Sequence, residues 1–457
     1  MNQTILYRFL ILIVLLLKQQ FVIAAFNITT TNIQSAIPIA IIPFIWNTDS
    51  IDRMDSTDST LSTIPVNTND PTIKQLPKLI STIITTDLFN SGRFKTLKEE
   101  GMLKQPQIGA DIDFSLWNTI GQKALVLGKI YYNSSNNYRL RFQILDVQNN
   151  SQIMDKWITI DIQNIRATAH KISDIIYEQF IGIPGAFTSQ IAYITTEAHN
   201  NPQILLNVAD IDGHNDQTIL SSNEPLLSPA WSPNSNKLAY VSLEQQQCTI
   251  YIQDLHTGIR KPIPTYSGIN SAPAWSPDGQ RLALVLSKDG NPEIYIFDFA
   301  TKKLSRITNH ISIDTEPSWS SDGSTIAFTS DRGGTPQIYT ISVNRPVNRH
   351  IAAKRLTFEG DYNANPVYSP DSKFLAFVTH REGASRIGLL NLATGKFEEM
   401  TPGPLDESPS FLSNGSMIIY ATQNNGHREL AAVSTDGQIY QSIKSKGMMW
   451  EPAYSKH

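Results

Sequence analysis

The sequence predicts a multidomain protein in which a small N-terminal α/β domain, residues 36–182, precedes a six-bladed β-propeller, residues 183–457. Two observations predict the propeller: a proline-to-aromatic phrase that recurs six times, and strand and turn signals that follow each copy in the same order. Upstream of the repeats, hydrophobic periodicity typical of helices packed on strands predicts the α/β domain.

The repeated phrase sets the size of the predicted blade. Successive aromatic anchors are 44, 44, 49, 43 and 43 residues apart, and a four-stranded blade needs about 40–45 residues. The long spacing coincides with an insertion at residues 343–353, which we expect in a surface loop. The anchors are Trp231, Trp275, Trp319, Tyr368, Phe411 and Tyr454.

Each unit except the last has the signals of four short strands, counted from the one that carries the anchor. A pair such as Asp278-Gly279 supplies the positive φ angles of a tight hairpin. A hydrophobic strand such as residues 282–285 follows, then a polar loop and an alternating strand such as residues 293–298. No helical periodicity interrupts the pattern, which therefore indicates all-β blades.

The ends of the repeat region predict how the ring closes. Three residues follow Tyr454, so the last unit has a single strand, whereas three strand-like runs upstream of Trp231 have no anchor before them. These runs cover residues 190–195, 203–209 and 217–220. We expect the C-terminal strand to pair with the N-terminal strands of the repeat region, which removes the open sheet edges.

The α/β domain is predicted from one long amphipathic helix and the strands around it. Residues 73–89 place six apolar residues on one helical face, and the turn at residues 90–92 ends the helix. Residues 47–70 are rich in Ser, Thr, Asp and Asn and are expected to form a mobile loop. The apolar face comprises Ile73, Leu76, Ile80, Ile83, Ile84 and Leu88. The other predicted elements are strands at 37–45, 93–97, 124–132, 138–147 and 156–160, a short helix at 114–121 and a long helix at 165–180.

The first 25 residues have the pattern of a secretory signal peptide. Arg8 precedes nine apolar residues, 9–17, a run too short to span a bilayer, and Ala24 and Ala25 offer a cleavage site. The alternative is an uncleaved membrane anchor, and no other candidate transmembrane segment is found. Cleavage leaves residues 26–35 as an exposed leader, unless this segment is only a frayed end.

Composition and motifs argue against several functions. The net charge is −4 and no Lys/Arg cluster is present, so nucleic acid is not an expected partner. The single cysteine, Cys248, cannot form an intramolecular disulfide. The acidic run at residues 210–216 lacks the spacing of a calcium loop and is interpreted as a turn between strands. No hydrolase, redox or zinc motif is found, so we expect no catalytic residue, metal or cofactor.

The residues just before each anchor proline are the candidate binding site. The innermost strand of a blade lines the central channel, so these residues are expected to ring one mouth of it. One side of the ring is apolar or neutral and the other is acidic with an exposed tryptophan, a composition that suits protein docking. A solvated mouth without a partner is the alternative. The acidic side comprises Asp314, Glu316, Asp406, Glu407 and Glu451, with Trp450 among them.

The domain order and several motifs resemble the TolB family, the periplasmic component of the Tol–Pal system of Gram-negative bacteria. The propeller repeat is shared with peptidase propellers, whereas the Asn90-Ser91-Gly92-Arg93-Phe94 element of the first domain is specific. The resemblance covers essentially the whole mature chain, and it is poor in the leader and in the 47–70 loop. The motifs that carry it lie at residues 39–44, 87–94, 182–187, 191–193, 227–233, 315–317 and 433–437.

The resemblance implies a non-catalytic periplasmic adaptor, a monomer without a membrane span once the signal peptide is removed. Members of this family bind the lipoprotein Pal at the propeller mouth and present their N-terminal segment to TolA, which supports outer-membrane constriction at division and envelope integrity. By position, Ala272, Thr315 and Glu316 match the Pal-facing rim. The predicted Pal site is Ala272, Asp314, Thr315, Glu316, Asp406, Glu407, Trp450 and Glu451, and the predicted TolA-binding residues are Phe26, Asn27, Ile28, Thr29 and Ile33.

Two other functions compete with this interpretation. A prolyl-oligopeptidase-like hydrolase also carries a propeller, but it needs a serine nucleophile elbow and a catalytic domain of about 200 further residues. A periplasmic propeller that binds another protein or a glycan is the second alternative. A pull-down from envelope extract separates these functions from the adaptor.

We predict that signal cleavage leaves a mature N-terminus at Ala25 or Phe26, because the short apolar core ends at a pair of small residues. Mass spectrometry of the exported protein measures this directly. A mass that retains residues 1–20 contradicts the prediction and favours the membrane anchor.

Overall fold

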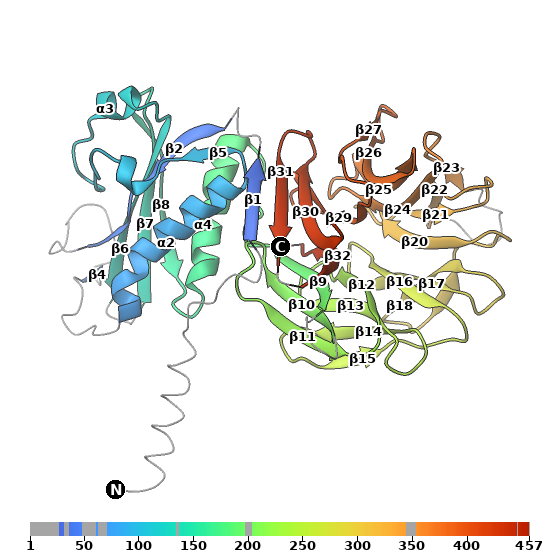
Figure 1. The fold of residues 1–457 in the computed structure, drawn as a ribbon. Helices are drawn as coiled ribbons and strands as arrows, with labels where there is room; N and C mark the ends of the chain where they lie inside the picture. The colour runs from blue at the N-terminus through green and yellow to red at the C-terminus, as the bar shows by residue number, and fades with distance from the viewer. Residues whose placement is uncertain are drawn as a thin grey trace, which may run out of the picture.

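The computed structural model describes residues 27–31, 36–47, 61–62, 71–133, 137–196, 203–343, 353–445 and 447–456. Within these ranges the chain forms an α/β domain beside a β-propeller, with strand β1 (Asn27–Thr31) between them (Figure 1). The predicted signal peptide, most of the 47–70 loop and most of the 343–353 insertion lie outside the described residues. None of the described helices is long and apolar enough to cross a membrane.

The α/β domain is built on one mixed sheet with strand order β5-β2-β6-β7-β8. Strand β2 runs parallel to β5 and β6, and β6 to β8 form an antiparallel meander. Two further short strands, β3 and β4, also pair with β6. The strands are β2 (Ile37–Ile41), β3 (Ile45–Trp46), β4 (Leu61–Ser62), β5 (Phe94–Thr96), β6 (Ala124–Asn133), β7 (Asn137–Asp146) and β8 (Ser151–Ile160), and the helices are α2 (Pro71–Asn90), η1 (Glu99–Gly101), α3 (Phe114–Thr119) and α4 (Ile165–Ile181).

Helices α2 and α4 bury the apolar faces that the sequence predicted. Leu76, Ile80 and Leu88 of α2 pack in the same core as Ile172 and Ile176 of α4. Asn164 caps the N-terminus of helix α4, and its side chain accepts a hydrogen bond from the backbone N–H of Ala167 at 3.1 Å. The periodic burial of one face, rather than helix propensity, therefore holds both helices on the sheet.

Two predicted strands differ from those observed. The predicted strand 37–45 is split into β2 and β3, because Pro43 between them has no N–H to donate to the ladder. Strand β8 begins at Ser151, five residues earlier than predicted. Its polar first half hides the strand signal, since Asp155 is stabilised by Arg141 of β7 at 2.7 Å rather than by apolar burial.

The propeller has six four-stranded blades in the part of the chain that the structure describes. From the innermost strand outward they are β12 (Leu226–Trp231), β13 (Lys237–Ser242), β14 (Thr249–Asp254) and β15 (Arg260–Pro262); β16 (Asn270–Trp275), β17 (Arg281–Leu286), β18 (Glu293–Asp298) and β19 (Leu304–Arg306); β20 (Asp314–Trp319), β21 (Thr325–Ser330), β22 (Gln337–Ser342) and β23 (Lys354–Arg355); β24 (Tyr362–Tyr368), β25 (Phe374–Arg381), β26 (Ala384–Asn391) and β27 (Phe397–Glu399); β28 (Glu407–Phe411), β29 (Met417–Asn424), β30 (His427–Ser434) and β31 (Tyr440–Lys444); and β32 (Met449–Tyr454), β9 (Gln190–Thr196), β10 (Ile204–Asp210) and β11 (Gln217–Ser222).

The predicted closure of the ring is confirmed. The C-terminal strand β32 pairs antiparallel with β9, the first strand after the α/β domain, with Met449 opposite Thr195 and Tyr454 opposite Ile191. The last blade therefore combines one strand from the C-terminus with three from the start of the repeat region. The acidic run at residues 210–216 forms the turn between β10 and β11, also as predicted.

The aromatic anchors join neighbouring blades by hydrogen bonds. The indole N–H of Trp231 donates to the carbonyl oxygen of Ala453 across the closing joint at 2.9 Å. Trp275 and Trp319 make the equivalent bonds, at 3.1 Å, to Ala230 and Ala274 of the preceding blades. In these three blades tryptophan therefore both fills the core and satisfies a carbonyl of the preceding blade.

We predict that Trp231→Phe lowers the free energy of unfolding by about 1–3 kcal/mol, because the carbonyl of Ala453 loses its donor in a buried setting. Urea denaturation measures the change. Trp157→Phe is the matched control, since this tryptophan lies half-exposed on the α/β domain, and equal effects of the two substitutions contradict the prediction.

Candidate functional site

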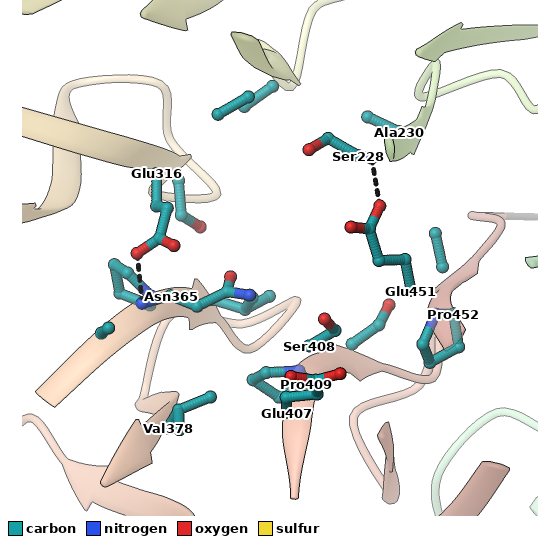
Figure 2. A pocket seen from close by; sticks show the side chains of 18 of the residues that line it. Ser228, Ala230, Glu316, Asn365, Val378, Glu407, Ser408, Pro409, Glu451 and Pro452 are labelled. Atoms are coloured by element: carbon teal, nitrogen blue, oxygen red, sulfur yellow. Dashed lines mark hydrogen bonds between the residues drawn. The ribbon is translucent and has the colours of Figure 1, made fainter. Parts of the chain in front are cut away.

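The innermost strands of the blades surround a central cavity of about 800 Å³ (Figure 2). The residues before each anchor occupy equivalent places in all six blades, so we number them backward from the aromatic anchor. The −3 residue directly precedes the anchor proline, and the −6 residue precedes or begins the innermost strand. Each place has its own environment, and these environments decide which predicted residues are available to a partner.

The six −3 residues line the cavity and share an unusual backbone conformation. Their φ angles lie between 47° and 56°, in the left-handed region that residues other than glycine rarely adopt. In each blade the pairing register of the innermost strand shifts at this point, as in a β-bulge, which turns the side chain toward the channel. The −3 residues are Ser228, Ala272, Glu316, Asn365, Ser408 and Glu451.

Two of the −3 residues are glutamates, and they lie three blades apart on opposite sides of the channel (Figure 2). Glu316 accepts hydrogen bonds of 2.7 Å from the backbone N–H of Asn365 and from the hydroxyl of Thr329. Glu451 accepts a hydrogen bond from the backbone N–H of Ser228. Each glutamate thus binds the −3 residue of the next blade, and burial raises the pKa of Glu451 to about 7.

Three predicted site residues are less accessible than expected. The −5 residue is buried in every blade, so Asp314 and Asp406 are not on the rim. Asp314 forms an ion pair with Arg332 at 2.6 Å, and Asp406 accepts a hydrogen bond from Thr422, also at 2.6 Å. Trp450, at −4, packs half-buried between two core clusters, so its predicted exposure was wrong. Strand alternation alone would turn the −5 and −3 side chains to the same face, but the bulge at −3 breaks this two-residue period, so the two places have different surroundings.

The remaining predicted residues lie at or beside the cavity. Ala272, Glu316 and Glu451 occupy −3 places, and Glu407 also lines the cavity, with an ion pair of 2.9 Å to Arg428. Thr315, at −4, is half-buried beside Glu316. The structure therefore brings most of the predicted acidic side to one mouth of the channel.

An apolar ring around the same mouth was missed by the sequence analysis. The −6 residue is apolar and exposed in every blade, whereas exposed apolar side chains are usually scattered singly over a surface. The sequence did carry a signal for this ring, because no charged residue stands at −6 in any of the six repeats. We call this ring the apolar rim; it comprises Pro225, Ile269, Ile313, Tyr362, Leu405 and Met448.

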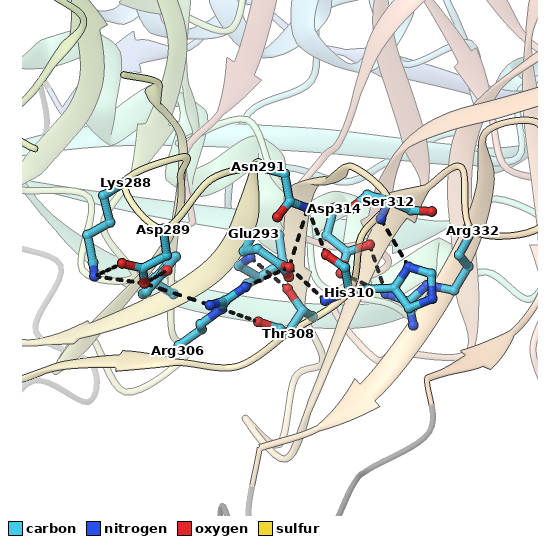
Figure 3. Close-up of polar contacts among 12 residues, drawn as sticks. Lys288, Asp289, Asn291, Glu293, Arg306, Thr308, His310, Ser312, Asp314 and Arg332 are labelled. Atoms are coloured by element: carbon cyan, nitrogen blue, oxygen red, sulfur yellow. Dashed lines mark hydrogen bonds and ion pairs between the residues drawn. The ribbon is translucent and has the colours of Figure 1, made fainter. Parts of the chain in front are cut away.

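The most exposed apolar residue of the rim region, Ile311, is 95% exposed and lies in the loop between β19 and β20. Figure 3 shows the polar contacts of His310 and Ser312, the residues on either side of it. The side-chain amide of Asn291 donates to the carbonyl oxygens of His310 at 2.8 Å and Ser312 at 2.7 Å. The backbone N–H of His310 donates at 2.7 Å to the buried carboxylate of Glu293. The loop is therefore pre-organised, so little conformational freedom remains to be lost when a partner binds Ile311.

Buried ion pairs continue this support beneath the loop (Figure 3). Arg306 contacts Glu293 at 2.9 Å, and Arg332 contacts Asp314. Burial raises the pKa of Asp314, although Arg332 opposes the shift. Asp314 therefore supports the rim from inside the blade.

The leader lies away from the mouth. Strand β1 pairs antiparallel with β31 and extends that blade by one strand, with Thr29 opposite Ser442. The hydroxyl of Thr30 donates to the carbonyl oxygen of Asn90 in α2 at 2.9 Å, so the strand contacts both domains. Among the predicted leader residues, Thr29 is exposed, Asn27 and Ile28 are described by their backbone pairing, and Phe26 and Ile33 lie outside the described residues.

The mouth and the domain interface lie at opposite ends of β28. The rim residue Leu405 precedes this strand, and Asn414 in the turn after it donates to the carbonyl oxygen of Pro184 at 2.8 Å. In the described part of the chain, two carboxylates and an imidazole, those of Asp87, Asp212 and His170, form a cluster at that interface.

Comparison with known proteins agrees with this architecture. The family model of the TolB β-propeller domain matches residues 177–457, and that of the TolB amino-terminal domain matches residues 50–153. The Tol-Pal system protein TolB of Nitrosococcus oceani is 45% identical over 450 residues, covering 98% of this chain and 97% of the relative. The same protein of Xanthomonas oryzae pv. oryzae is 47% identical over 382 residues, covering 83% and 86%.

A solved structure extends the match to the fold of both domains. The crystal structure of TolB from Acinetobacter baumannii has 35% sequence identity and a TM-score of 0.80, and the match covers 94% of this chain and 100% of that one. The chain therefore belongs to the TolB family of Tol–Pal system proteins.

Proposed function

We propose that the protein is a non-catalytic periplasmic adaptor of the Tol–Pal system that binds Pal at the propeller mouth and TolA through its leader. In this role it supports outer-membrane constriction during division and envelope integrity. The observation that carries the proposal is the apolar rim around an acidic channel mouth, in a chain of the TolB family. The signal-peptide pattern at residues 1–25 supports the periplasmic location.

The rim has the composition of a protein-binding surface. Protein interfaces place apolar side chains around a desolvated centre, and a few of them contribute most of the binding energy. Here the −6 residues and Ile311 provide apolar anchors, and the −3 residues provide polar groups inside the ring. A Pal loop that enters the channel can contact both at once, with its polar atoms directed at the −3 residues.

The predicted Pal-binding residues take two roles in this proposal. Ala272, Glu316, Glu407 and Glu451 lie where Pal can contact them. Thr315, Asp314, Asp406 and Trp450 position the rim and the channel wall from beneath. Glu316 is a poor choice for a binding test, because its replacement also removes the hydrogen bonds to Asn365 and Thr329.

We predict that Ile311→Asp and Leu405→Asp each weaken Pal binding by about 1–3 kcal/mol, because a charge is placed in an apolar contact. Both side chains are exposed, so the thermal midpoint is expected to stay nearly unchanged. Calorimetric titration with Pal measures the effect.

Ile259→Asp is the matched control for these variants. Ile259 is an equally apolar, exposed residue in the turn between β14 and β15, and it does not line the mouth. Unchanged Pal affinity in both rim variants, or an equal loss in the control, contradicts the proposed location.

The docked leader provides the second half of the proposal. Strand β1 is the outermost strand of its sheet and is held by the ladder to β31 and the contact between Thr30 and Asn90. To bind the leader, TolA must compete with the contacts that β1 makes with β31 and α2. If Pal binding changes the stability of the pairing between β1 and β31, then by linkage TolA binding changes the free energy of Pal binding by the same amount. Such coupling free energies are typically about 1–3 kcal/mol.

Deletion of residues 26–35 is expected to abolish TolA binding and to leave the fold and Pal binding intact. The deleted strand lies at a sheet edge and away from the mouth, which is the reason for expecting a folded variant. Titration of the mature protein and the variant with the periplasmic part of TolA and with Pal measures both affinities. Retained TolA binding in the variant contradicts the role of the leader.

A further inference from the structure

A buried cluster of charged side chains joins the two domains. Asp87 comes from α2, His170 from α4 and Asp212 from the turn between β10 and β11, and their ligand-type atoms all lie within 4.8 Å of one another. His170 and Asp87 are 2% and 3% exposed. The propeller mouth is at the other end of the strands, so the proposed Pal site does not account for this cluster.

The hydrogen bonds of the cluster define the orientation of the imidazole. Nδ1 of His170 lies 2.8 Å from a carboxylate oxygen of Asp87, and the hydroxyl of Ser173 donates to the same oxygen at 2.7 Å. A carboxylate accepts, so Nδ1 carries a proton. Nε2 lies 3.7 Å from Asp212 Oδ2 and has no hydrogen-bond partner.

A neutral imidazole does not suit this geometry. With the proton on Nδ1, Nε2 presents a lone pair to the carboxylate of Asp212, and two acceptors repel each other. A second proton on Nε2 turns the same arrangement into an ion pair with Asp212 while the hydrogen bond to Asp87 is kept. The ring is then charged and faces one carboxylate from each domain.

The surrounding carboxylates favour this second proton, and the guanidinium of Arg166 opposes it. Arg166 of α4 contacts Asp212 and lies 3.9 Å from Asp210, and Nδ1 of His214 lies 3.3 Å from the other oxygen of Asp212. The carboxylates of Asp210 and Asp212 thus share the guanidinium of Arg166, whereas Asp87 is bonded to His170 and Ser173. A protonated His170 supplies a further positive charge in a place where unpaired buried charge is costly.

We propose that His170 is a proton-linked clamp between the domains: in its doubly protonated form it bridges Asp87 and Asp212, and loss of its proton loosens the interface between α2, α4 and the propeller. The clamp acts at the end of α2 that also contacts the leader, because Asp87 is one helical turn before Asn90.

The pKa directions agree with this geometry. Burial and the charge of Arg166 lower the pKa of His170, but the hydrogen bond and charge of Asp87 and the charge of Asp212 outweigh both and leave it above its usual 6.5. Burial also raises the pKa of Asp87, so the pair binds its proton tightly. Burial opposes ionisation of Asp212, but His214, Arg166 and His170 lower its pKa to about 2.

The sign of the pH dependence follows from the raised pKa of His170. The stability that the clamp contributes is fully present below the pKa of the unfolded chain, near 6.5, and is lost as the pH rises through the higher pKa of the folded protein. Acidification therefore tightens this interface and alkaline pH loosens it.

Histidine-selective NMR titration of the mature protein tests the protonation state. We expect His170 to titrate above pH 6.5 and Asp212→Asn to lower its pKa, whereas the control Asp371→Asn, in an exposed turn beside Lys373, leaves it unchanged. A pKa of His170 below 6.5 in the unsubstituted protein overturns the proposal, and this measurement does not depend on any variant folding.

A double-mutant cycle of His170→Gln and Asp212→Asn tests the clamp across the interface. At pH 6 the thermal midpoints are expected to show a coupling of about 2–4 °C that disappears at pH 9, while His256→Gln, an exposed control, shows none. Coupling that is absent at pH 6, or equal at both values, overturns the clamp. A rise of the midpoint on addition of Zn²⁺ that His170→Gln abolishes also overturns it, because the cluster is then a metal site.

Discussion

Closure of the propeller by β32 and β9 is the interaction on which the rest of the structure depends. It removes the two open sheet edges of the ring, and it places the C-terminus against the first strand after the α/β domain. The indole of Trp231 donates across the same joint, as Trp275 and Trp319 do between other blades. Closure also makes the six repeats equivalent in space, so that one place in the repeat becomes a circle around the channel.

The arrangement of side chains at the mouth follows from that equivalence. At −3 the bulge turns side chains into the channel, at −5 they are buried in the blade, and at −6 they are exposed around the rim. A charge has a different role at each place: Glu316 joins two blades from inside the channel, whereas Asp314 supports the rim loop from within a blade. The apolar rim and the polar channel are thus two layers of one surface.

One blade connects the mouth, the leader and the domain interface. Strand β28 begins beside Leu405 on the rim, and β31 of the same sheet holds β1. The turns of this blade contact Pro184, in the segment that joins the domains, through Asn414, and Arg93 of the α/β domain through Asp436. The end of α2 lies against this blade, where a side chain at Gly92 would come within 2.7 Å of Ile439. A shift at the mouth therefore has a short, continuous route through packed elements to the leader and to the cluster around His170.

The two domains, the six blades, the closing joint and the faces of α2 and α4 could all be predicted from the sequence, because these depend on local periodicity and on a repeat that every blade must satisfy. The sequence also indicated the acidic side of the mouth. The burial of Asp314 and Asp406 could not be predicted, since a bulge at −3 changes the strand period without a glycine to mark it. The apolar rim was readable in the repeats, but its exposure depends on how the blades pack. His170 and Asp212 are 42 residues apart in different domains, so their pairing arises only when the domains meet.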